Sequence, residues 1–440
     1  MSNVSSYGVA IIGCGTVGGA TALLLTRDRE ILSRRLGLNL DLRHIVDLDF
    51  ANARKLGLDE KLYRTSLQDA LDDPKVGVVA ELIGGTTIAR SFIEKALNAG
   101  KNVVTANKAL LAQHGSELYA LARKNGVCMA FEASCAGGIP IIRALCDGLI
   151  ANRIDAMYGI VNGTCNHILT AMIRHGQSYA AALAEAQQTG LAEADPTLDV
   201  TGVDSAHKLA ILAALAFNQK VDFKLIPVQG IDKLDLRDVA YGRELGYVVK
   251  LLAIAQRQEN GLSLRVRPAF ISQEHPLAWV CGPFNAVSVY GHANGHTMYY
   301  GRGAGGLPTA SAVAADLASV AMGNAKRQFD QLRIWPDLNE PARQLPIDEI
   351  TSRYYIRILA VDRPGVFAYI ATILGKMGIS ISSVLQREAP AQSTHVPVVI
   401  TTAKASEGAI RKALDQVDAL DVVTGKSVCL SIVDEHPEHL

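Results

Sequence analysis

The sequence predicts an α/β protein that opens with a doubly wound parallel sheet of the Rossmann type, followed by an α+β domain and a C-terminal βαββαβ unit. Short apolar runs alternate with helix-like runs over roughly the first 138 residues. A glycine-rich turn, Gly13-Cys-Gly-Thr-Val-Gly18, separates the first apolar run from the first helical one. The chain is 49% hydrophobic but 5% aromatic, which indicates a core of Ala, Val, Leu and Ile.

Composition limits the class of protein further. At 440 residues the chain is long enough for two or three domains. Lys and Arg number 43, as do Asp and Glu, so no overall charge attracts nucleic acid or an anionic membrane. The N-terminus lacks a signal-like segment, and no apolar run reaches the roughly 18 residues of a membrane span. Seven cysteines without C-x-x-C spacing predict reduced thiols and therefore a cytoplasmic protein. Because the charge is balanced and no membrane span is predicted, we expect neither nucleic-acid nor membrane partners.

The first domain is predicted to alternate strands with helices. The expected strands are Tyr7–Ile12, Leu40–Val46, Val76–Leu82, Asn102–Thr105 and Val127–Glu132. The expected helices are Val17–Leu36, Ile88–Ala99 and Leu110–Asn125. This order predicts a parallel sheet with helices on both faces.

The predicted secondary structure changes twice in the middle of the chain. Residues 138–219 are predicted to be mostly helical. A β-rich stretch follows, in which Ala286–Tyr290 and Thr297–Tyr300 form a hairpin. A glycine-rich loop at 301–309 precedes a helix from Ala310 to about Gly323, and prolines at 336, 341 and 346 mark a linker over 336–351.

The C-terminal unit is predicted to have the order βαββαβ. Its expected elements are strand Tyr354–Val361, helix Gly365–Met377, strands Ile379–Arg387 and His395–Thr401, helix Ala409–Leu414 and strand Ser427–Ile432. The expected domains are therefore 1–138, completed by about 305–335, then 139–304, and, after the linker, 352–440.

The glycine-rich turn is the first candidate site. Between a strand and a helix, Gly13 permits a tight turn, Gly15 lets a pyrophosphate approach the backbone, and Gly18 lets helix and strand pack closely. Thr16 and Val17 begin the helix, whose N-terminal N–H groups would bind phosphate. The pattern predicts dinucleotide binding, although such glycine turns also serve structure alone.

The residues after the next strands bear on the choice of nucleotide. Asp47 ends the second strand, where a carboxylate would accept the ribose 2′-hydroxyl of NAD and repel the 2′-phosphate of NADP. Basic residues at positions 43, 54 and 55 leave NAD and NADP both open, with NAD favoured. A loop containing Gly85 and Thr86 is expected beside the ribose and nicotinamide, unless its glycines are only structural.

Two lysines are candidates for proton transfer, because hydride delivery to a carbonyl leaves negative charge on its oxygen. Lys108 follows a strand at the sheet edge where ligands bind. Lys208 lies four residues after Asp204 on one helix face, at the end of an acidic stretch that begins at Glu193. Taken alone, that spacing is more often a surface ion pair, and an acidic stretch is often a solvated loop.

Three runs resemble the signature of homoserine dehydrogenase: NGTCNHILT at 162–170, GLAEADPTLDV at 190–200 and GVDSAHKLAIL at 202–212. The similarity extends to the glycine turn, to TANK at 105–108 and to GAGGLPTAS from Gly303. The resemblance implies interconversion of L-homoserine and L-aspartate 4-semialdehyde with NAD or NADP, in the route to threonine, methionine and isoleucine. Because the chain begins directly at the dehydrogenase, we expect a monofunctional enzyme.

By this resemblance, roles carry over to matching positions. Lys208 would be the general acid/base at the carbonyl oxygen, and Lys108 would assist near the nicotinamide and substrate. Residues 139–304 would bind substrate and dimerise, and the loop at Gly303 would close over the cofactor. The substrate-binding residues would be Glu193, Asp199, Asp204 and Thr164, of which Glu193 and Asp204 would hold the ammonium group.

The resemblance also implies a monovalent cation, Na⁺ or K⁺. Glu132 and the backbone at Cys135, Gly137 and Ile139 match the family's cation position. One carboxylate with carbonyl oxygens suits such an ion better than zinc. The alternative is a buried Glu132 that caps a loop.

The C-terminal unit resembles an ACT domain in residues 362–368 and 378–382. Such domains bind amino acids at paired interfaces, which implies threonine feedback with effector contacts at Asp362, Gly365 and Ile379. A purely dimerising role is the alternative. The resemblance implies a homodimer or homotetramer.

Two other functions remain open from the sequence. One is an amino-acid sensor whose Rossmann domain binds a nucleotide without turnover, which the intact Lys108, Glu193, Asp204 and Lys208 disfavour. The other is a dehydrogenase of a different semialdehyde, which would have no need for the acidic stretch at 193–208.

Overall fold

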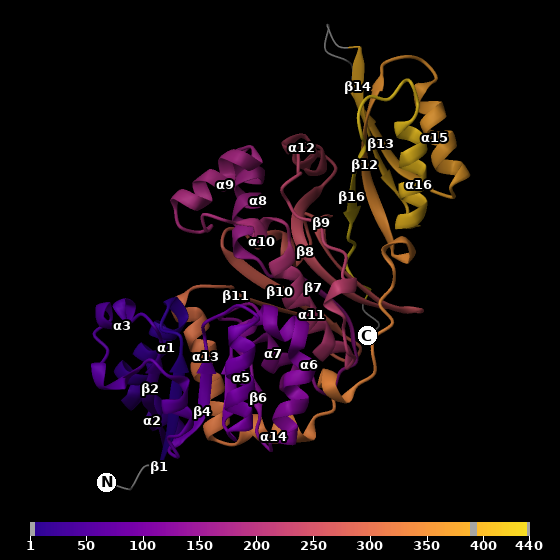
Figure 1. Ribbon diagram of the computed structural model, residues 1–440. Helices are drawn as coiled ribbons and strands as arrows, with labels where there is room; N and C mark the ends of the chain where they lie inside the picture. Colours follow the sequence, from indigo (N-terminus) through magenta and orange to yellow (C-terminus); the bar gives the residue numbers. More distant parts are fainter. Residues whose placement is uncertain (1–4, 388–393, 438–440) are drawn as a thin grey trace.

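Two sheets organise the chain. The computed structural model describes residues 5–387 and 394–437. A six-stranded parallel sheet forms the N-terminal domain, and a larger mixed sheet runs from the middle of the chain into the C-terminal unit. Figure 1 shows these parts in succession, with the N-terminal sheet in indigo and purple at one end and the C-terminal unit in yellow at the other. The predicted fold class is confirmed.

The first sheet has the order β3-β2-β1-β4-β5-β6, with every pair parallel. Its strands are β1 (Ser5–Ile12), β2 (Leu38–Val46), β3 (Tyr63–Arg64), β4 (Val76–Glu81), β5 (Asn102–Thr105) and β6 (Met129–Ala130). Its helices are α1 (Thr16–Arg27), α2 (Arg29–Leu36), α3 (Ala51–Lys55), η1 (Glu60–Leu62), α4 (Leu67–Leu71), α5 (Ile88–Asn98) and α6 (Lys108–Lys124). The order places the strand-order reversal between β1 and β4, where such folds bind dinucleotides.

Most predicted boundaries shift by one or two residues, and two elements are shorter than predicted for an identifiable reason. The single helix expected at 17–36 is two helices, because the chain bends at Asp28, whose φ of −98° and ψ of 14° interrupt the helix. The last strand, β6, ends at Ala130, and Glu132 already belongs to the 3₁₀ turn η2 (Glu132–Ser134). Both differences shorten elements whose apolar pattern continues past their ends.

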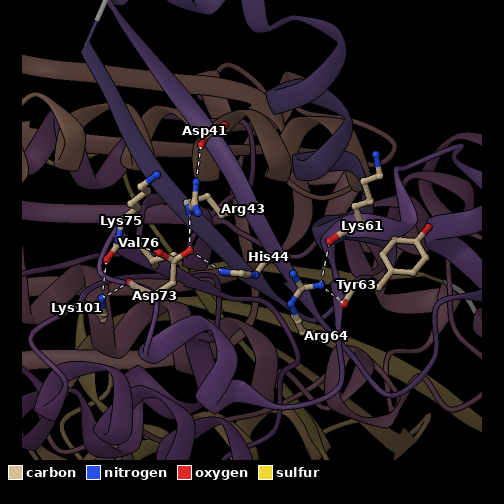
Figure 2. A network of polar contacts seen from close by, with 10 residues as sticks. All are labelled: Asp41, Arg43, His44, Lys61, Tyr63, Arg64, Asp73, Lys75, Val76 and Lys101. Carbon is tan, nitrogen blue, oxygen red and sulfur yellow. Dashed lines mark hydrogen bonds and ion pairs between the residues drawn. The ribbon is translucent and has the colours of Figure 1, made fainter.

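A polar network closes the amino-terminal edge of this sheet, away from the glycine turn (Figure 2). Asp73 Oδ2 accepts hydrogen bonds from Arg43 Nε at 2.6 Å and pairs with His44 Nε2 at 2.9 Å. Burial raises the pKa of Asp73, but the hydrogen bonds, with Arg43 first, lower it well below its ordinary value. The buried Lys101 Nζ donates to the backbone oxygens of Asp73 and Val76 at 2.9 and 2.8 Å. The charged groups are paired within the network, and His44 Nδ1 is the one ring nitrogen of His44 without a partner among the described residues, so we interpret the network as structural.

The middle of the chain builds the second sheet and its helices. The strands are β7 (Ile154–Ile160), β8 (Tyr247–Gln258), β9 (Gly261–Ser272), β10 (Phe284–Gly291) and β11 (Gly295–Arg302). The helices are α7 (Ile141–Arg143), η3 (Ala144–Gly148), α8 (Gly163–His175), α9 (Tyr179–Gln188), α10 (Thr197–Val200), α11 (Val203–Phe217), η4 (Phe223–Leu225), α12 (Leu236–Glu244), η5 (Pro276–Trp279), α13 (Gly306–Ala321) and α14 (Asn324–Gln331). The predicted hairpin is confirmed as β10 and β11.

The prediction that residues 138–219 are mostly helical is wrong at β7. This strand, Ile-Asp-Ala-Met-Tyr-Gly-Ile, lies between β10 and β8 in the sheet and is almost fully buried. A strand covered on both faces shows no alternation of apolar and polar residues, so periodicity alone could not identify it.

Helix α13 returns from the second sheet to the first domain. Figure 1 shows it beside α1, although the two helices are nearly 300 residues apart in sequence. A side chain added at Gly306 would lie 3.3 Å from Thr16, so the two helix N-termini meet closely. Farther along α13, the buried Asp316 accepts from Glu132 N at 2.8 Å and from Arg143 Nη2 at 2.9 Å.

The proline-rich connection to the C-terminal unit is packed and includes η6 (Pro336–Leu338) and η7 (Ile347–Glu349). Trp335 is buried against the rings of Tyr119, Phe131 and Phe329. Asp337 then accepts from Arg123 Nε at 2.7 Å. The segment predicted as a linker is therefore fixed to the N-terminal domain, because its apolar and charged side chains find partners that composition does not reveal.

The C-terminal unit has the predicted βαββαβ order with one added short strand. Its elements are β12 (Thr351–Val361), α15 (Val366–Lys376), β13 (Ile381–Gln386), β14 (His395–Thr402), β15 (Ala405–Ser406), α16 (Glu407–Asp418) and β16 (Val428–Ile432). The sheet order is β16-β12-β14-β13, and α15 and α16 lie together on one face (Figure 1). One set of its buried residues, with α15 and α16, forms a separate apolar core, whereas Tyr355, Val399, Leu430 and Ile432 pack into the main core of the chain.

All seven cysteines are free thiols, as predicted, and five of them are buried. Within residues 5–387 and 394–437, no helix is long and apolar enough to cross a membrane.

The strands of the middle and C-terminal units form one continuous sheet. Strand β16 pairs in parallel with β9, so the hydrogen-bonded ladder continues from one unit to the other. Beside this seam, the fully buried Asp238 of α12 accepts from Arg357 Nε at 2.6 Å, from Arg357 Nη2 at 2.9 Å and from the Tyr355 hydroxyl at 2.9 Å. A second buried pair joins Arg267 Nη1 to Glu407 Oε2 at 2.7 Å.

We predict that Asp238→Ala destabilises the protein by about 3–5 kcal/mol, because it removes both close carboxylate contacts of the buried Arg357 guanidinium and leaves it only Asp235, at 3.5 Å. The free energy of unfolding, measured by urea titration with circular dichroism, checks this. The control is Arg237→Ala, whose exposed pair with Asp235 on the same helix should contribute less than about 1 kcal/mol. Equal effects of the two variants would contradict the prediction.

Candidate functional site

The glycine turn is tight on its inner side and open on its outer side. Gly13 has φ of +93°, and a side chain there would meet Leu82 and Ile83 at 2.7–2.8 Å. A Cβ on Gly18 would lie 1.8 Å from Gly13 O. A Cβ on Gly15 would meet nothing within 4 Å. Two glycines are therefore required for packing, and Gly15 leaves open the space that a pyrophosphate needs at the N-terminus of α1.

Two side chains from other elements hold this turn. Asp47, after β2, accepts from Cys14 N through Oδ2 at 2.5 Å. Asn52 of α3 donates to Cys14 O at 2.8 Å and to Gly15 O at 3.0 Å. One carboxylate oxygen of Asp47 thus already supports the turn, and a contact with ribose stays a prediction. No pattern in the sequence pointed to Asn52.

A second loop lies at the same edge, after β4. Glu81 is 1% exposed; its Oε1 accepts from Ile83 N and Gly84 N, and its Oε2 accepts from the Thr105 hydroxyl at 2.7 Å. Asn107, the N-cap of α6, donates to Gly85 O at 2.6 Å. Glu81 therefore fixes the loop that carries Gly85 and Thr86 next to the start of α6.

Sequence reasoning missed Glu81, Thr105 and Asn107. A signal was present for Glu81, because it is the one charged residue of an otherwise apolar strand, Val-Gly-Val-Val-Ala-Glu. A carboxylate at the carboxyl end of a buried strand needs donors, and the following glycine loop supplies them.

The two candidate lysines meet at one carboxylate. Lys108 Nζ lies 3.1 Å from Asp204 Oδ1, and Lys208 Nζ lies 2.6 Å from Asp204 Oδ2. Lys208 Nζ also donates to Val161 O at 2.6 Å. The side chains of Lys208 and Asp204 are 10% and 8% exposed, whereas that of Lys108 is 39% exposed. The i,i+4 pair is therefore buried, and the surface-pair alternative is wrong.

The charges of this triad stabilise one another. Burial raises the pKa of Asp204, but Lys208 and then Lys108 hold it well below its ordinary value. Asp204 is also the main cause that raises the pKa of Lys108. Asp204 and Lys108 are therefore charged at neutral pH, and Lys108, with a side chain that is 39% exposed, is the more accessible of the two lysines.

Asn162 joins the triad to the helix that follows it. Its side chain caps α8 by accepting from Cys165 N at 2.8 Å, and its amide donates to Asp204 Oδ2 at 2.9 Å and to Asp199 Oδ1 at 2.7 Å. Thr164 donates to Leu191 O at 3.0 Å and so ties the same helix end to the segment just before the acidic stretch. The sequence singled out the run 162–170 but gave Asn162 no role.

Glu193 lies on the exposed loop before α10. Among the described residues its carboxylate takes part in no hydrogen bond or ion pair; only its backbone oxygen accepts, from Gln187 at 3.3 Å. The structure thus brings Asp199, Asp204, Lys108 and Lys208 together and leaves the Glu193 side chain unengaged.

The candidate cation loop lies next to this cluster. Glu132 is 3% exposed, and its two oxygens accept from Ile142 N at 2.9 Å and Arg143 N at 2.8 Å. Glu132 therefore caps the start of a helix, which agrees with the alternative that it is a buried capping residue. Burial, and next Asp316, raise the pKa of Glu132 to about 7.

The backbone of the same loop is unusual. Ala136 and Gly137 both have left-handed φ, of 53° and 49°. In the described chain no hydrogen bond to Cys135 O or Gly137 O is found, while Ile139 O accepts from Ile141 N. The Cys135 thiol is fully buried and burial raises its pKa to about 12, which excludes it as a nucleophile at neutral pH.

Gly303 is buried rather than exposed at the cofactor site. A Cβ there would lie 1.9 Å from Asn285 Nδ2, and Gly303 O lies 2.6 Å from where a Cβ of Gly137 would be. Residues 304 and 305 are the exposed part of this loop, next to the start of α13. Gly303 packs against Gly137, so only the exposed part of the loop is open to a cofactor, and closure of the loop over the cofactor stays a prediction.

The three effector candidates lie in different environments. Asp362 and Gly365 are exposed at the start of α15, where Gly365 has φ of +87° and is the N-cap. Ile379 is 3% exposed and belongs to the core of the C-terminal unit, and its N–H donates to Leu374 O. Its side chain is therefore packed in the core, away from the surface that carries Asp362 and Gly365, and an effector contact at Ile379 stays a prediction.

In folds with this strand order, dinucleotides bind across the carboxyl edge of the strands. The glycine turn, the Gly85 loop and the start of α6 with Lys108 all lie at that edge. Fold and site together define the class: an NAD(P)-binding oxidoreductase with a C-terminal ACT domain.

Comparisons with known proteins agree along the whole chain. Residues 13–132 match the family model "Homoserine dehydrogenase, NAD binding domain", residues 140–318 match "Homoserine dehydrogenase" and residues 354–419 match "ACT domain". The homoserine dehydrogenase of Pseudomonas aeruginosa is 44% identical over 431 residues, covering 96% of this chain and 98% of the relative. That of Bacillus subtilis is 39% identical, covering 94% and 95%.

Solved structures agree with the same family. The crystal structure of a homoserine dehydrogenase from Thiobacillus denitrificans superposes with a TM-score of 0.92 at 42% identity, covering 98% of this chain and 99% of that one. A hyperthermophilic archaeal homoserine dehydrogenase in complex with NADPH has a TM-score of 0.61 at 27% identity, covering 72% and 98%. This chain belongs to the homoserine dehydrogenase family.

We predict that Gly15→Ala raises the KM for the nucleotide at least tenfold while changing stability by less than about 1 kcal/mol. Its φ of −69° suits alanine, and the added methyl group would occupy open space that a pyrophosphate requires. Steady-state kinetics and thermal unfolding check the two effects.

The matched variant is Gly18→Ala, whose methyl group would overlap Gly13 O. It should destabilise the fold by about 1–3 kcal/mol, which is the usual effect of overpacking. If Gly15→Ala left the nucleotide KM unchanged, the open side of the turn would not be the phosphate site.

Proposed function

We propose that this protein interconverts L-homoserine and L-aspartate 4-semialdehyde with NAD or NADP, and that Lys208 and Lys108 handle the proton. The observation that carries the proposal is the buried carboxylate of Asp204 between the two ammonium groups, at 2.6 and 3.1 Å, at the nucleotide edge of the sheet. Family membership supports the substrate.

The bound nicotinamide supplies hydride transfer to and from the substrate carbon. The protein must then stabilise the substrate oxygen, which is a hydroxyl in the alcohol and gains negative charge when the aldehyde is reduced. Lys208 serves as general acid/base, because Asp204 and Val161 O fix its head group. Lys108 assists, and its outward donors can orient the same oxygen or relay the proton to solvent.

Substrate recognition is proposed to use the acidic groups around this pair. Asp199 and Asp204 are held in place by the Asn162 amide, so their orientation is set before a substrate arrives. Glu193 would hold the substrate ammonium group, since its carboxylate has no other engagement in the described chain. Asp204 would contribute by its charge while it remains bound to the lysines. Thr164 would shape the pocket through its bond to Leu191 O.

A monovalent cation, Na⁺ or K⁺, is proposed at the Glu132 loop. The donor set fits a weakly held hard ion: a buried carboxylate with spare lone pairs, and carbonyl oxygens at Cys135 and Gly137 for which no hydrogen bond is found in the described chain. The raised pKa of Glu132 reflects a buried negative charge that a cation would offset. Such an ion would hold the loop that Gly303 packs against.

The C-terminal unit is proposed to confer feedback inhibition by threonine. The ACT match and the exposed N-terminus of α15, with Asp362 and Gly365, support a site for the carboxylate and ammonium of an amino acid. The buried pairs Arg357–Asp238 and Arg267–Glu407 offer a rigid route from this unit to the catalytic domain. The preferred nucleotide, a homodimer or homotetramer and a cytoplasmic location stay predictions, as does the place of the reaction in threonine, methionine and isoleucine synthesis.

We predict that Lys208→Ala lowers kcat at least 10²-fold, the usual contribution of a positioned acid/base, while nucleotide affinity stays within about threefold. Steady-state oxidation of homoserine and calorimetric titration with the nucleotide check this. The control is Lys101→Met, which removes a buried lysine on the opposite edge of the sheet and should lower stability with little change in kcat. A kcat near normal in Lys208→Ala would remove its assigned role.

We predict that threonine inhibits the enzyme and that Asp362→Ala weakens inhibition at least fivefold without altering the homoserine KM. Threonine inhibition curves measure the strength of inhibition, and steady-state kinetics at varied homoserine concentration measure the KM. Both are recorded with and without K⁺. Arg363→Ala, at the adjacent exposed position, is the comparison. An enzyme that does not respond to threonine would leave the C-terminal unit with a dimerising role.

A further inference from the structure

A cavity of about 400 Å³ lies outside the catalytic cluster, beside the C-terminal half of α8, whose N-terminus adjoins the cluster. Four elements form it: the C-terminal half of α8, helix α12, the start of β8 and the 3₁₀ turn η5 with the residues after it. Its volume is in the range of pockets that hold small molecules. None of the catalytic or nucleotide-binding residues lines it.

The charged side chains of this cavity are all cationic. Arg174, Arg243 and Lys250 line it, and no acidic side chain does. No salt bridge within the described residues neutralises any of the three. Arg174 Nη2 donates to Cys281 Sγ at 3.2 Å, a weak neutral acceptor. The cavity therefore carries positive charge that the described chain does not compensate.

Burial of the Lys250 ammonium group without a counter-ion costs free energy. The residue is 1% exposed, and its Nζ donates to two neutral acceptors, Val280 O at 2.5 Å and Asn166 Oδ1 at 3.3 Å. An ammonium group has three donors, so one remains without an acceptor among the described residues. Burial lowers the pKa of Lys250 to about 8. A buried cation without a counter-ion is rarely kept for stability, because its desolvation is not repaid.

The rest of the lining is largely apolar. Ile173, Val239 and Ala278 supply aliphatic surface, and Trp279, which is 77% exposed, stands at the rim. A free phosphate would leave this surface unused. An amino-acid zwitterion would bring its ammonium group next to three cations, which disfavours it.

We propose that this cavity is a second ligand site, which binds a small organic anion consisting of a carboxylate on an apolar body. The carboxylate would pair with Lys250 and Arg174, and the body would lie against Ile173, Val239 and Trp279. The proposal does not depend on the proposed function, because it concerns different residues.

The site is separate from the catalytic cluster but shares a helix with it. Asn162 caps α8 at the cluster, and the cavity begins at Thr170, roughly 12 Å farther along the helix axis. The side chain of Asn166, between them, binds Lys250 Nζ and also donates to Gly282 O and Phe284 O.

Binding can be followed directly, because Trp279 is one of only two tryptophans and the other, Trp335, is buried in the N-terminal domain. The full-length protein is titrated with 4-methylpentanoate, with 4-methylpentanamide, with leucine and with inorganic phosphate, while tryptophan fluorescence is recorded. We expect a saturable change with 4-methylpentanoate at a Kd of roughly 1 mM or below. The other three probes should bind at least tenfold more weakly, and Trp279→Phe should lose the signal.

Variants test the assigned contacts. Arg174→Gln and Lys250→Met should each weaken 4-methylpentanoate binding at least tenfold in calorimetric titrations. Arg237→Gln, on α12 but paired with Asp235 and absent from the lining, should bind as the unaltered protein does. Arg174 is exposed, so its variant decides the question even if Lys250→Met fails to fold. Equal binding of the amide or of phosphate, or normal affinity in Arg174→Gln, would overturn the proposal.

Discussion

The carboxylate of Asp204, held between two lysine ammonium groups, is the interaction on which the active site depends. Each lysine comes from a different domain: Lys108 begins α6 on the Rossmann sheet, and Lys208 lies in the middle of the buried helix α11. Without Asp204 the two cations would repel each other across a short distance. One carboxylate thus brings together the two lysines that are proposed to handle the proton and links the two domains that carry them.

Buried carboxylates perform similar work elsewhere in the molecule. Glu81 fixes the loop beside α6, Glu132 caps α7, and Asp238 anchors the C-terminal unit through Arg357. In each case a charge is buried only where several donors satisfy it, because an unpaired carboxylate in the interior would be expensive. The functional loops are therefore held by polar contacts from neighbouring elements, while the apolar strands supply the scaffold.

Much of the fold was predictable because its signals are local. The G-x-G-x-x-G turn, the alternation of strands and helices and the βαββαβ unit each depend on residues close in sequence. The missed elements were those whose pattern depends on distant neighbours. Strand β7 is buried on both faces, and the proline-rich connection is fixed by Trp335 and Asp337 to partners some 200 residues earlier.

The sequence by itself determined the family, the nucleotide turn and the identity of the two lysines, because these depend on residue types at fixed spacing. The tertiary structure alone decided their partners. It pairs Lys108 with Asp204, and it places the Asn162 amide so that it donates to Asp199 and Asp204. It also buries Gly303 and Ile379 and leaves Glu193 exposed. Burial and pairing are properties of the packed chain, since they arise where segments far apart in sequence meet.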